Sequence, residues 1–236
     1  MSKINISVDC VIFGFDSDSD LKVLLITKKE NPKATMEGSK TQIALPGDLI
    51  KLREELDPAA KRILNSLTSI EEIYLKQFGI FSNPDRVKKP KDQLWLKSFR
   101  ENPEERVITI GYMYLVNIQD FKTKASSFAD EVEWINVNAI PELTFDHNEI
   151  VSSALSFLKK ELNHEMSSIL LPKNFTLPQL QKLYEDVLNK KFDKRNFRKQ
   201  ILKEGVITKT NHINKTGRKG KPATFYQFNE DKKNVD

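Results

Sequence analysis

The stretch from Leu45 to Ile70, "LPGDLIKLREELDPAAKRILNSLTSI", contains a Pro-Gly turn, a charged loop and a run that predicts a helix. The helix is expected to begin at Asp57-Pro58, because aspartate caps helix N-termini and proline fits the first helical position. The second half of the run contains no acidic residue. A helix of this kind can pack against a sheet, but it cannot offer clustered carboxylates to a hard metal ion.

The composition is that of an ordinary globular protein. With 236 residues and 39% hydrophobic content, the chain can form one large domain or two modest ones. It has no apolar run of roughly 18 residues, and its first ten residues carry charges where a secretory signal needs apolar side chains. We therefore expect a cytoplasmic protein with no membrane partner. The single cysteine, Cys10, excludes an internal disulfide and a cysteine-based zinc site, and we expect it to be buried.

The formal charge of +5 is unevenly distributed along the chain. From Ser168 onward there are sixteen Lys and Arg against seven Asp and Glu, so this part carries +9 and the remainder carries −4. A basic domain attached to a mildly acidic one indicates that one half of the protein meets a polyanion and the other half has a different task.

The N-terminal part, which we place at residues 1–166, is rich in predicted strands. Ile6 to Phe15 and Leu21 to Lys29 are apolar runs joined by "DSDSD", which predicts an antiparallel hairpin. Further strands are predicted at 41–45, 72–82, 106–118 and 131–137, and a closing helix within 145–165 with Asp146 or Asn148 as its N-cap. The segment Asn83 to Glu105 is predicted to be a long charged loop.

The hairpin turn resembles the start of a calcium loop, with Asp16, Asp18 and Asp20 in alternation. However, Leu21 stands where such a loop needs glycine, and Thr27 stands where it needs a bidentate glutamate. We therefore expect a solvated turn and no metal site.

The C-terminal part, residues 167–236, predicts the element order of a winged helix-turn-helix. Thr176 and Gln179 form a capping box for one helix, and Asp193 caps a second helix, Lys194 to Glu204, which ends at Gly205. Two alternating runs follow, at 206–210 and 223–228, joined by a basic tip. Helix, short turn, helix and hairpin in this order predict a domain that binds double-stranded DNA.

The second of these helices is predicted to contact the major groove. Phe197, Ile201 and Leu202 are expected to face the core. The polar residues of its N-terminal half are the expected DNA contacts: Lys194, Arg195, Asn196, Arg198 and Lys199. On the wing tip, Arg218, Lys219 and Lys221 are expected to add phosphate or minor-groove contacts. The alternative, a basic helix that is merely solvated, is less favoured because the element order and the basic wing agree with DNA binding.

The opening stretch resembles the Nudix box of Nudix hydrolases, whose pattern is Gly-x5-Glu-x7-Arg-Glu-U-x-Glu-Glu-x-Gly-U, with U aliphatic. The positions that keep this frame are Gly47, Ala59, Ala60, Arg62, Leu64 and Ile70. The resemblance implies an α+β fold in which a Nudix-like α/β/α sandwich with a mixed sheet precedes the small winged helix-turn-helix domain.

The glutamates of that box are replaced in this chain. The replacing residues are Arg53, Ile63, Ser66, Leu67 and Ser69. In Nudix hydrolases the glutamates hold Mg²⁺ against a diphosphate, a task that needs clustered oxygen ligands. Glu54 and Glu55 lie one and two residues out of register and are poor substitutes. We therefore expect no catalytic residue, no bound metal and no cofactor, and a protein that is not an enzyme.

The chain as a whole resembles Nudix-related transcriptional regulators of the NrtR and AraR type. The resemblance is strongest in "LLPKNFTLPQLQKLYEDVLNKKFDKRNFRKQILKEGVI", and it extends to "VDCVIFGF" and "PELTFDHNEIV". It implies a homodimer that binds a palindromic operator and senses a small molecule. The broken box implies a sugar effector such as arabinose or another pentose, and hence a role in sugar metabolism. The segment Val87 to Asn102 departs from the family pattern and looks inserted.

Residues that could bind the effector are polar groups at predicted strand ends. The candidates are Asp9, Lys28, Arg86 and Arg106, although each of them, taken singly, is more typical of a surface charge or a structural ion pair. Asp146 and His147 are interpreted as a helix cap and a buried imidazole. Trp95 and Phe99 either cover the pocket or anchor the insertion, and the sequence leaves both possibilities open.

Two other functions compete with the sugar-responsive regulator. One is a Nudix hydrolase, or a sensor, that acts on ADP-ribose or a related NAD-derived nucleotide. The other is a sensor that binds a protein partner through its wing. The missing glutamates argue against the hydrolase, and salt-dependent binding to duplex DNA would exclude the protein-binding alternative.

Overall fold

The computed structural model describes residues 4–16, 20–28, 42–67, 74–97, 100–120, 131–213 and 223–229. Within these ranges, one mixed sheet has seven strands. They are β1 (Ile4–Phe15), β2 (Leu21–Lys28), β3 (Gln42–Ala44), β4 (Gly47–Leu49), β5 (Tyr74–Phe81), β6 (Arg106–Asn117) and β7 (Glu131–Asn136). The main path runs β3-β2-β1-β6-β5, with β4 also paired to β1 and β7 to β2. The pairing of β1 with β6 is parallel along both strands, whereas the neighbouring pairs are antiparallel.

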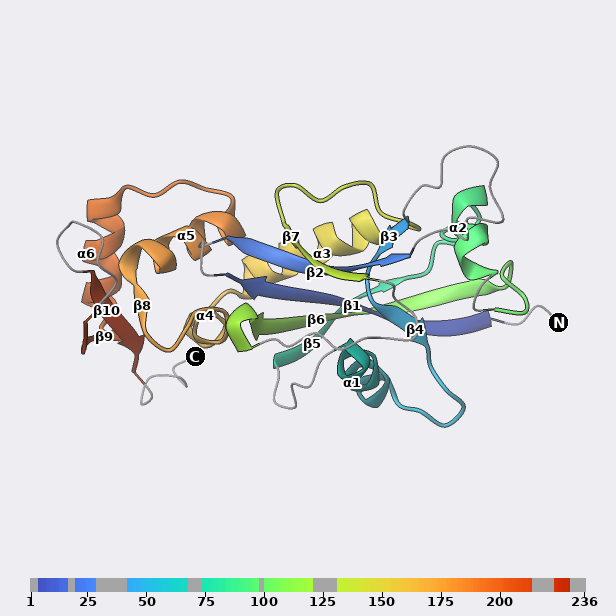
Figure 1. Cartoon of the computed structure of the whole chain (residues 1–236), viewed down its shortest axis with the longest axis horizontal. Helices are drawn as coiled ribbons and strands as arrows, with labels where there is room; N and C mark the ends of the chain where they lie inside the picture. Colours follow the sequence, from blue (N-terminus) through green and yellow to red (C-terminus); the bar gives the residue numbers. More distant parts are fainter. Residues whose placement is uncertain are drawn as a thin grey trace.

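Helices cover both faces of this sheet (Figure 1). α1 (Leu56–Leu67) packs on the face that includes Val8, Cys10 and Ile12 of β1. α3 (His147–Glu161) packs on the opposite face, where Val11 and Phe13 point. Successive β1 side chains therefore enter two different cores, because side chains alternate across a strand. The expected α/β/α sandwich with a mixed sheet is confirmed, and so is the burial of Cys10.

Several predicted elements differ in extent from those observed. The 6–15 and 21–29 hairpin is confirmed as the antiparallel pair β1 and β2, while turn residues 17–19 lie outside the described ranges. α1 begins at Leu56, one residue before the expected start. The closing helix ends at Glu161, and a separate α4 (His164–Leu170) follows. A short 3-10 helix, η1 (Ile118–Asp120), ends β6.

The segment predicted as a long loop contains a helix, α2 (Pro90–Leu96). Pro90 occupies its first turn, which is where proline is tolerated in a helix. This helix was not predicted from the sequence, because its apolar face is short and charged residues flank it. The loop prediction is therefore wrong for these residues.

The C-terminal part has the predicted winged helix order. α5 (Leu177–Leu188) begins with the Thr176–Gln179 capping box, and α6 (Lys194–Glu204) begins after Asp193 and ends at Gly205 with a φ of 64°. β9 (Ile207–Ile213) and β10 (Thr224–Phe228) form the hairpin. β8 (Phe175–Thr176), which the sequence did not predict, pairs with β10 and completes a three-stranded sheet.

Hydrophobic side chains continue from the large sheet into the winged helix. One cluster of buried residues includes Val11 and Met113 of the sheet, Met166 of α4 and Leu183 of α5. The predicted division between residues 166 and 167 falls inside α4 and stays a prediction. Across the described residues, no helix is both long enough and apolar enough to cross a membrane.

Candidate functional site

A pocket of about 340 Å³ is lined in part by residues of α2 and β4. Figure 1 shows these two elements at the end of the large sheet that lies away from the winged helix. The first half of β1 supplies Ser7 and Asp9, the β3–β4 turn supplies Leu45, and the start of β4 supplies Gly47. Other lining residues come from the 86–100 segment and from the start of α3: Arg86, Trp95, Arg100, Phe145 and His147. Charged and aromatic side chains thus share one cavity, as in many small-molecule sites.

Arg86 is the centre of a buried polar network in this pocket. Its side chain is 3% exposed. Its Nε and Nη2 atoms donate to the two carboxylate oxygens of Asp146 at 2.8 and 2.6 Å, which is a bidentate ion pair. Its Nη1 donates to the Thr109 hydroxyl, and Nη2 also lies 3.4 Å from Oδ2 of Asp9. Each of the three guanidinium nitrogens therefore has an acceptor in the protein.

Asp9 and His147 complete the network. The backbone N–H of Leu45 donates to Nδ1 of His147 at 2.8 Å, so the ring proton is on Nε2, which faces Oδ2 of Asp9 at 3.4 Å. Burial raises the pKa of Asp9, but the hydrogen bond from His147 and the charge of Arg86 outweigh it, so this pKa is lower than usual. Asp9 stays ionised at neutral pH.

The interpretation of Asp146 as a helix cap is confirmed for its position but not for its side chain. Asp146 occupies the N-cap position of α3, but its carboxylate makes no capping hydrogen bond and instead binds Arg86. Asn148, the other candidate, accepts from the N–H of Leu143 and donates to the carbonyl of Pro141. The buried imidazole expected for His147 is confirmed.

Helix α2, in the segment predicted to be inserted, is anchored to the pocket through Phe145. The buried carboxylate of Asp92 accepts from the backbone N–H of Phe145 at 2.9 Å, and the ring of Trp95 meets that of Phe145 edge-on. Phe145 has a φ of 62°, in the left-handed region that non-glycine residues rarely adopt. Such strain persists where surrounding contacts enforce it, and it is common at ligand sites. Trp95 therefore both anchors α2 and lines the pocket. Phe99 lies outside the described residues.

The four predicted effector residues divide into two groups. Asp9 and Arg86 line the pocket and lie close to each other. Arg106 begins β6 with an exposed side chain, and its Nη2 lies 3.4 Å from the carbonyl of Ser82. Lys28 ends β2, and its side chain is outside the described part of the chain. The sequence prediction missed Arg100 and Phe145, because nothing local distinguishes either residue from a surface charge or a core aromatic.

The helix that resembles a Nudix box does not fit a magnesium ion. Its one carboxylate, Asp57, accepts a hydrogen bond from the hydroxyl of Tyr112 at 2.5 Å. Glu54, in the preceding loop, accepts from Nε of Arg62 at 2.7 Å, and Asp48 accepts from Nη1 at the same distance. The residues that the structure describes contain no group of three or more His, Cys, Asp or Glu placed to hold a metal ion. The nearby acidic side chains thus bind Arg62 rather than face a shared ion site.

The predicted recognition helix, α6, has the required exposure. Lys194, Arg195 and Asn196 are exposed, and so are Arg198 and Lys199. Asp193 accepts from the N–H groups of Arg195 and Asn196, which fixes the N-terminal turn.

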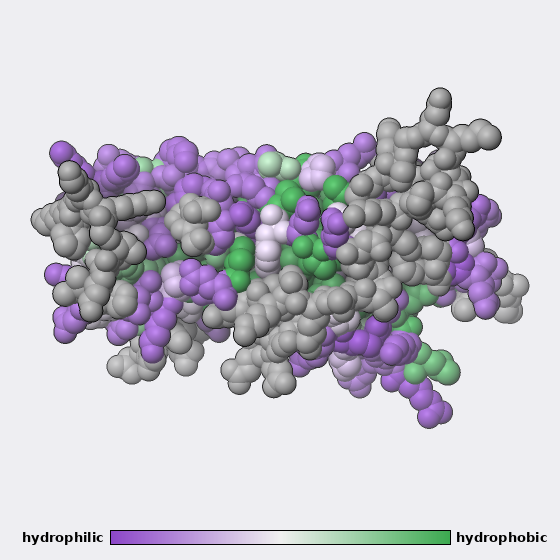
Figure 2. Space-filling view, viewed as in Figure 1, coloured by the Kyte–Doolittle hydropathy of each residue, from purple (hydrophilic) through white to green (hydrophobic). Residues whose placement is uncertain are grey.

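The packing of α6 corrects one expectation. Phe197 and Ile201 are buried as expected, but Leu202 is 41% exposed and does not belong to the core. Figure 2 shows that the described surface at the winged helix end, on the left, is mostly hydrophilic. The predicted wing residues Arg218, Lys219 and Lys221 lie outside the described ranges.

Comparison with known proteins identifies this domain. Residues 168–228 match the family model of the NrtR DNA-binding winged helix domain. The C-terminal domain is an NrtR-type winged helix. The crystal structure of Shewanella oneidensis NrtR complexed with a 27mer DNA has the same fold over both domains. Its TM-score is 0.68 at 24% identity, covering 95% of this chain and 93% of that one.

Two characterised relatives are similar in sequence. An "ADPR responsive transcriptional repressor NtrR" from Acinetobacter baylyi is 27% identical over 227 residues, which is 94% of this chain and 81% of the relative. An "ADP-ribose pyrophosphatase" from Methanocaldococcus jannaschii is 28% identical over 146 residues, which is 62% of this chain and 70% of the relative. The chain therefore combines a Nudix-like domain with an NrtR-type winged helix. The comparisons give no support to the AraR type.

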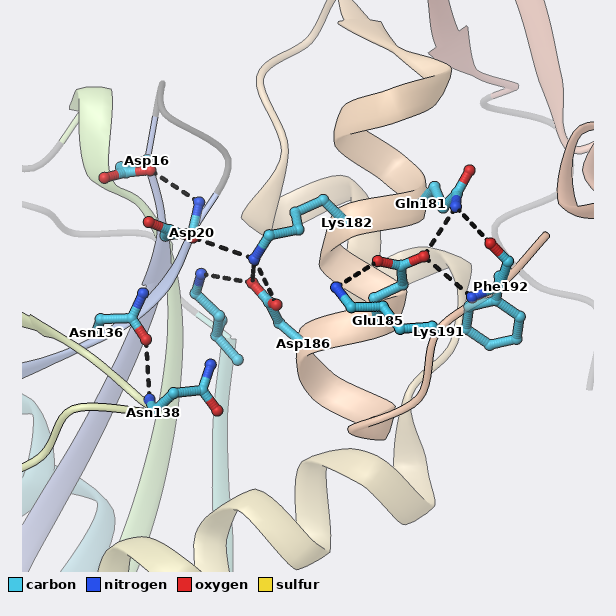
Figure 3. A network of polar contacts seen from close by, with 11 residues as sticks. Asp16, Asp20, Asn136, Asn138, Gln181, Lys182, Glu185, Asp186, Lys191 and Phe192 are labelled. Carbon is cyan, nitrogen blue, oxygen red and sulfur yellow. Dashed lines mark hydrogen bonds and ion pairs between the residues drawn. The ribbon is translucent and has the colours of Figure 1, made fainter. Parts of the chain in front are cut away.

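The NrtR-type domain is joined to the large sheet by a second polar network, shown in Figure 3. Asp186 of α5 accepts from the N–H of Leu21 at 3.2 Å, where β2 begins. Lys182 donates to Asp186 at 2.5 and 2.6 Å and to Asp20 at 3.1 Å. Burial lowers the pKa of Lys182, but hydrogen bonds to Asp186 and Asp20 outweigh it and raise this pKa. These contacts lie at the opposite end of β2 from the pocket residue Ile26.

Proposed function

We propose that this protein is a sequence-specific regulator of transcription that binds double-stranded DNA and senses ADP-ribose or a related NAD-derived nucleotide. In this proposal the pocket between the sheet, α2 and α3 holds the nucleotide, and the protein does not hydrolyse it. The observation that carries the proposal is a charged and aromatic pocket in a Nudix-like domain whose box helix has lost its metal-binding glutamates.

Binding to DNA is supported by the geometry of α6. Its basic N-terminal half is exposed and its start is capped by Asp193. A recognition helix contacts base edges through such residues, while neighbouring lysines and arginines bind phosphates. By analogy with dimeric helix-turn-helix proteins, the homodimer and the palindromic operator with half-sites roughly 10 base pairs apart remain predictions.

A nucleotide suits the pocket better than a pentose. A neutral sugar would offer no anion to the arginines of the pocket and no flat ring to Trp95 and Phe145. A nucleotide has phosphates, a base and a ribose, which match cations, aromatic rings and hydrogen-bonding groups respectively. The name of the Acinetobacter relative, which responds to ADP-ribose, also supports this choice. No comparable observation supports the sugar effector.

The absence of hydrolysis is proposed from the chemistry of the box. Breaking a diphosphate with magnesium needs carboxylates that hold the ion against the leaving group. α1 carries serine and leucine at positions 66 and 67 where the family has paired glutamates, and Arg62 engages both Glu54 and Asp48.

The test combines DNA binding with ligand binding. A labelled duplex carrying the operator upstream of the regulated gene should bind the protein, and ADP-ribose should change that affinity whether or not Mg²⁺ is present. Arg195→Ala should weaken operator binding by about 1 to 3 kcal/mol if Arg195 contacts a guanine. An effect of a pentose but not of ADP-ribose would reverse the choice of effector. Release of AMP from ADP-ribose in the presence of Mg²⁺ would mean that the domain is an enzyme.

A further inference from the structure

The two arginines of the pocket are in opposite electrostatic situations. Arg86 donates to Asp146, Thr109 and Asp9, so its charge is compensated by the protein. Arg100 also lines the pocket, but its Nη1 nitrogen is buried and has no hydrogen-bond partner among the described residues. A buried donor without an acceptor is unfavourable, and the penalty is larger for a charged group.

The acidic residues whose charges reach Arg100 are bound elsewhere. Asp9 and Asp48 both act on Arg100 through their charges. Asp9 is paired with Arg86 and His147, and Asp48 is paired with Arg62. Glu105 accepts a hydrogen bond from the amide of Asn5. None of these carboxylates makes a hydrogen bond with Arg100 in the part of the chain that the structure describes.

We propose that Arg100 is the anion-binding residue of the pocket and that its partner is a phosphate group of the nucleotide. This inference rests on the proposed function and deepens it. A guanidinium presents N–H groups in a planar fork that matches two phosphate oxygens. Arg86 cannot bind a phosphate in this way without breaking its ion pair with Asp146. Its role is to hold Asp9 and Asp146 in place in the wall of the pocket.

The position of Arg100 explains what the inserted segment contributes. Arg100 follows α2, and its N–H donates to the carbonyl of Leu96 at 2.8 Å. α2 is itself tied to Phe145 through Asp92 and Trp95. The inserted segment therefore places the guanidinium of Arg100 and the ring of Trp95 in the pocket, and its contacts with Phe145 hold both in position. In this way the inserted segment selects the ligands of the pocket. They are compounds in which a phosphate is joined to a group that can pack against Trp95 and Phe145.

The experiment measures binding of ADP-ribose, adenosine and inorganic diphosphate to three full-length proteins by isothermal titration calorimetry. These are the wild type, Arg100→Gln and the control Lys97→Gln, which removes an exposed positive charge from the same segment. Arg100→Gln should weaken ADP-ribose binding by about 10- to 100-fold, the usual effect of losing a charged hydrogen bond. It should abolish diphosphate binding and leave adenosine binding unchanged, whereas Lys97→Gln should behave as the wild type.

Stability separates a binding role from a structural one. Because Arg100 lacks a protein partner at Nη1, Arg100→Gln without ligand should melt at the wild-type temperature or above it. A lower melting temperature together with unchanged ADP-ribose affinity would make Arg100 a structural residue and overturn the inference. If the wild type binds diphosphate through Arg100 but not ADP-ribose, the anion site stands and the proposed nucleotide does not. If the wild type binds neither compound, both proposals are wrong.

Discussion

Both ends of the large sheet carry networks of charged residues, but the charged groups are paired differently at the two ends. At the end next to α5, Lys182 donates to both Asp186 and Asp20, and Asp186 also accepts from the N–H of Leu21. At the pocket end, Arg86 is satisfied in the same way, whereas Nη1 of Arg100 has no partner among the described residues. Satisfied buried charges fix how elements pack. The unsatisfied donor on Arg100 is the group to which a ligand would supply a hydrogen-bond acceptor.

The largest effect is expected from breaking the satisfied network of the pocket. Arg86→Ala would leave the buried carboxylates of Asp9 and Asp146 without their cation. Removing one partner of a buried ion pair lowers the free energy of unfolding by about 3 to 5 kcal/mol. Urea denaturation followed by circular dichroism measures this change.

The matched control is Arg106→Ala, because Arg106 is exposed at the start of β6. We expect it to change the free energy of unfolding by less than about 0.5 kcal/mol. Equal losses in the two variants would show that burial does not distinguish these arginines.

A smaller effect is expected at the domain interface. The Asp186 side chain is 7% exposed, and Asp186→Ala would remove the acceptor for Lys182 and for the N–H of Leu21. We expect a loss of about 1 to 3 kcal/mol, the cost of leaving the buried N–H of Leu21 unpaired. Hydrogen exchange should become faster at the amide of Leu21.

The control at this end is Lys191→Ala, whose side chain is 82% exposed and binds Glu185 within the winged helix domain. It should leave the exchange of Leu21 unchanged. If Asp186→Ala also left that exchange unchanged, the network would not hold the two domains together.

The smallest effect is expected at a more exposed charge cluster near α1. The hydrogen bond from Arg62 lowers the pKa of Glu54 to about 2. A lowered pKa adds stability that is fully present above the ordinary pKa of about 4.5 and is lost as the pH falls toward 2. Glu54→Gln should therefore cost up to about 1 kcal/mol at pH 7, because solvent screens such pairs.

The test is acid denaturation of both proteins from pH 7 to pH 2. The difference in stability between wild type and Glu54→Gln should shrink below about pH 4.5, since the wild-type carboxylate becomes protonated. A difference that stays constant with pH would mean that the ion pair with Arg62 does not stabilise the fold.

Much of the architecture could be predicted from local patterns. The alternation in β1 and β2, the capping box at Thr176 and the αL glycine at 205 are short-range signals. α2 and β8 were missed because each is short, and their formation depends on partners elsewhere in the chain: Phe145 for α2 and β10 for β8.

The pocket was predicted less completely than the fold. Asp9 and Arg86 were expected to bind an effector, yet both are largely occupied by protein partners. Arg86 and Asp146 lie 60 residues apart in sequence, and no local pattern indicates that they will pair. Arg100 was not distinguished because its charge is common in a polar segment, and only its surroundings make it unusual.

The sequence by itself determined most of the element types, the order of the winged helix, the basic character of α6 and the loss of the metal-binding glutamates. These features depend on residue identity and on spacing within a few turns or strands. The tertiary structure decided which charges are neutralised, which donor is left without a partner among the described residues, and that α2 forms one wall of the pocket. The physical reason is that burial and hydrogen bonding depend on groups brought together from distant parts of the chain.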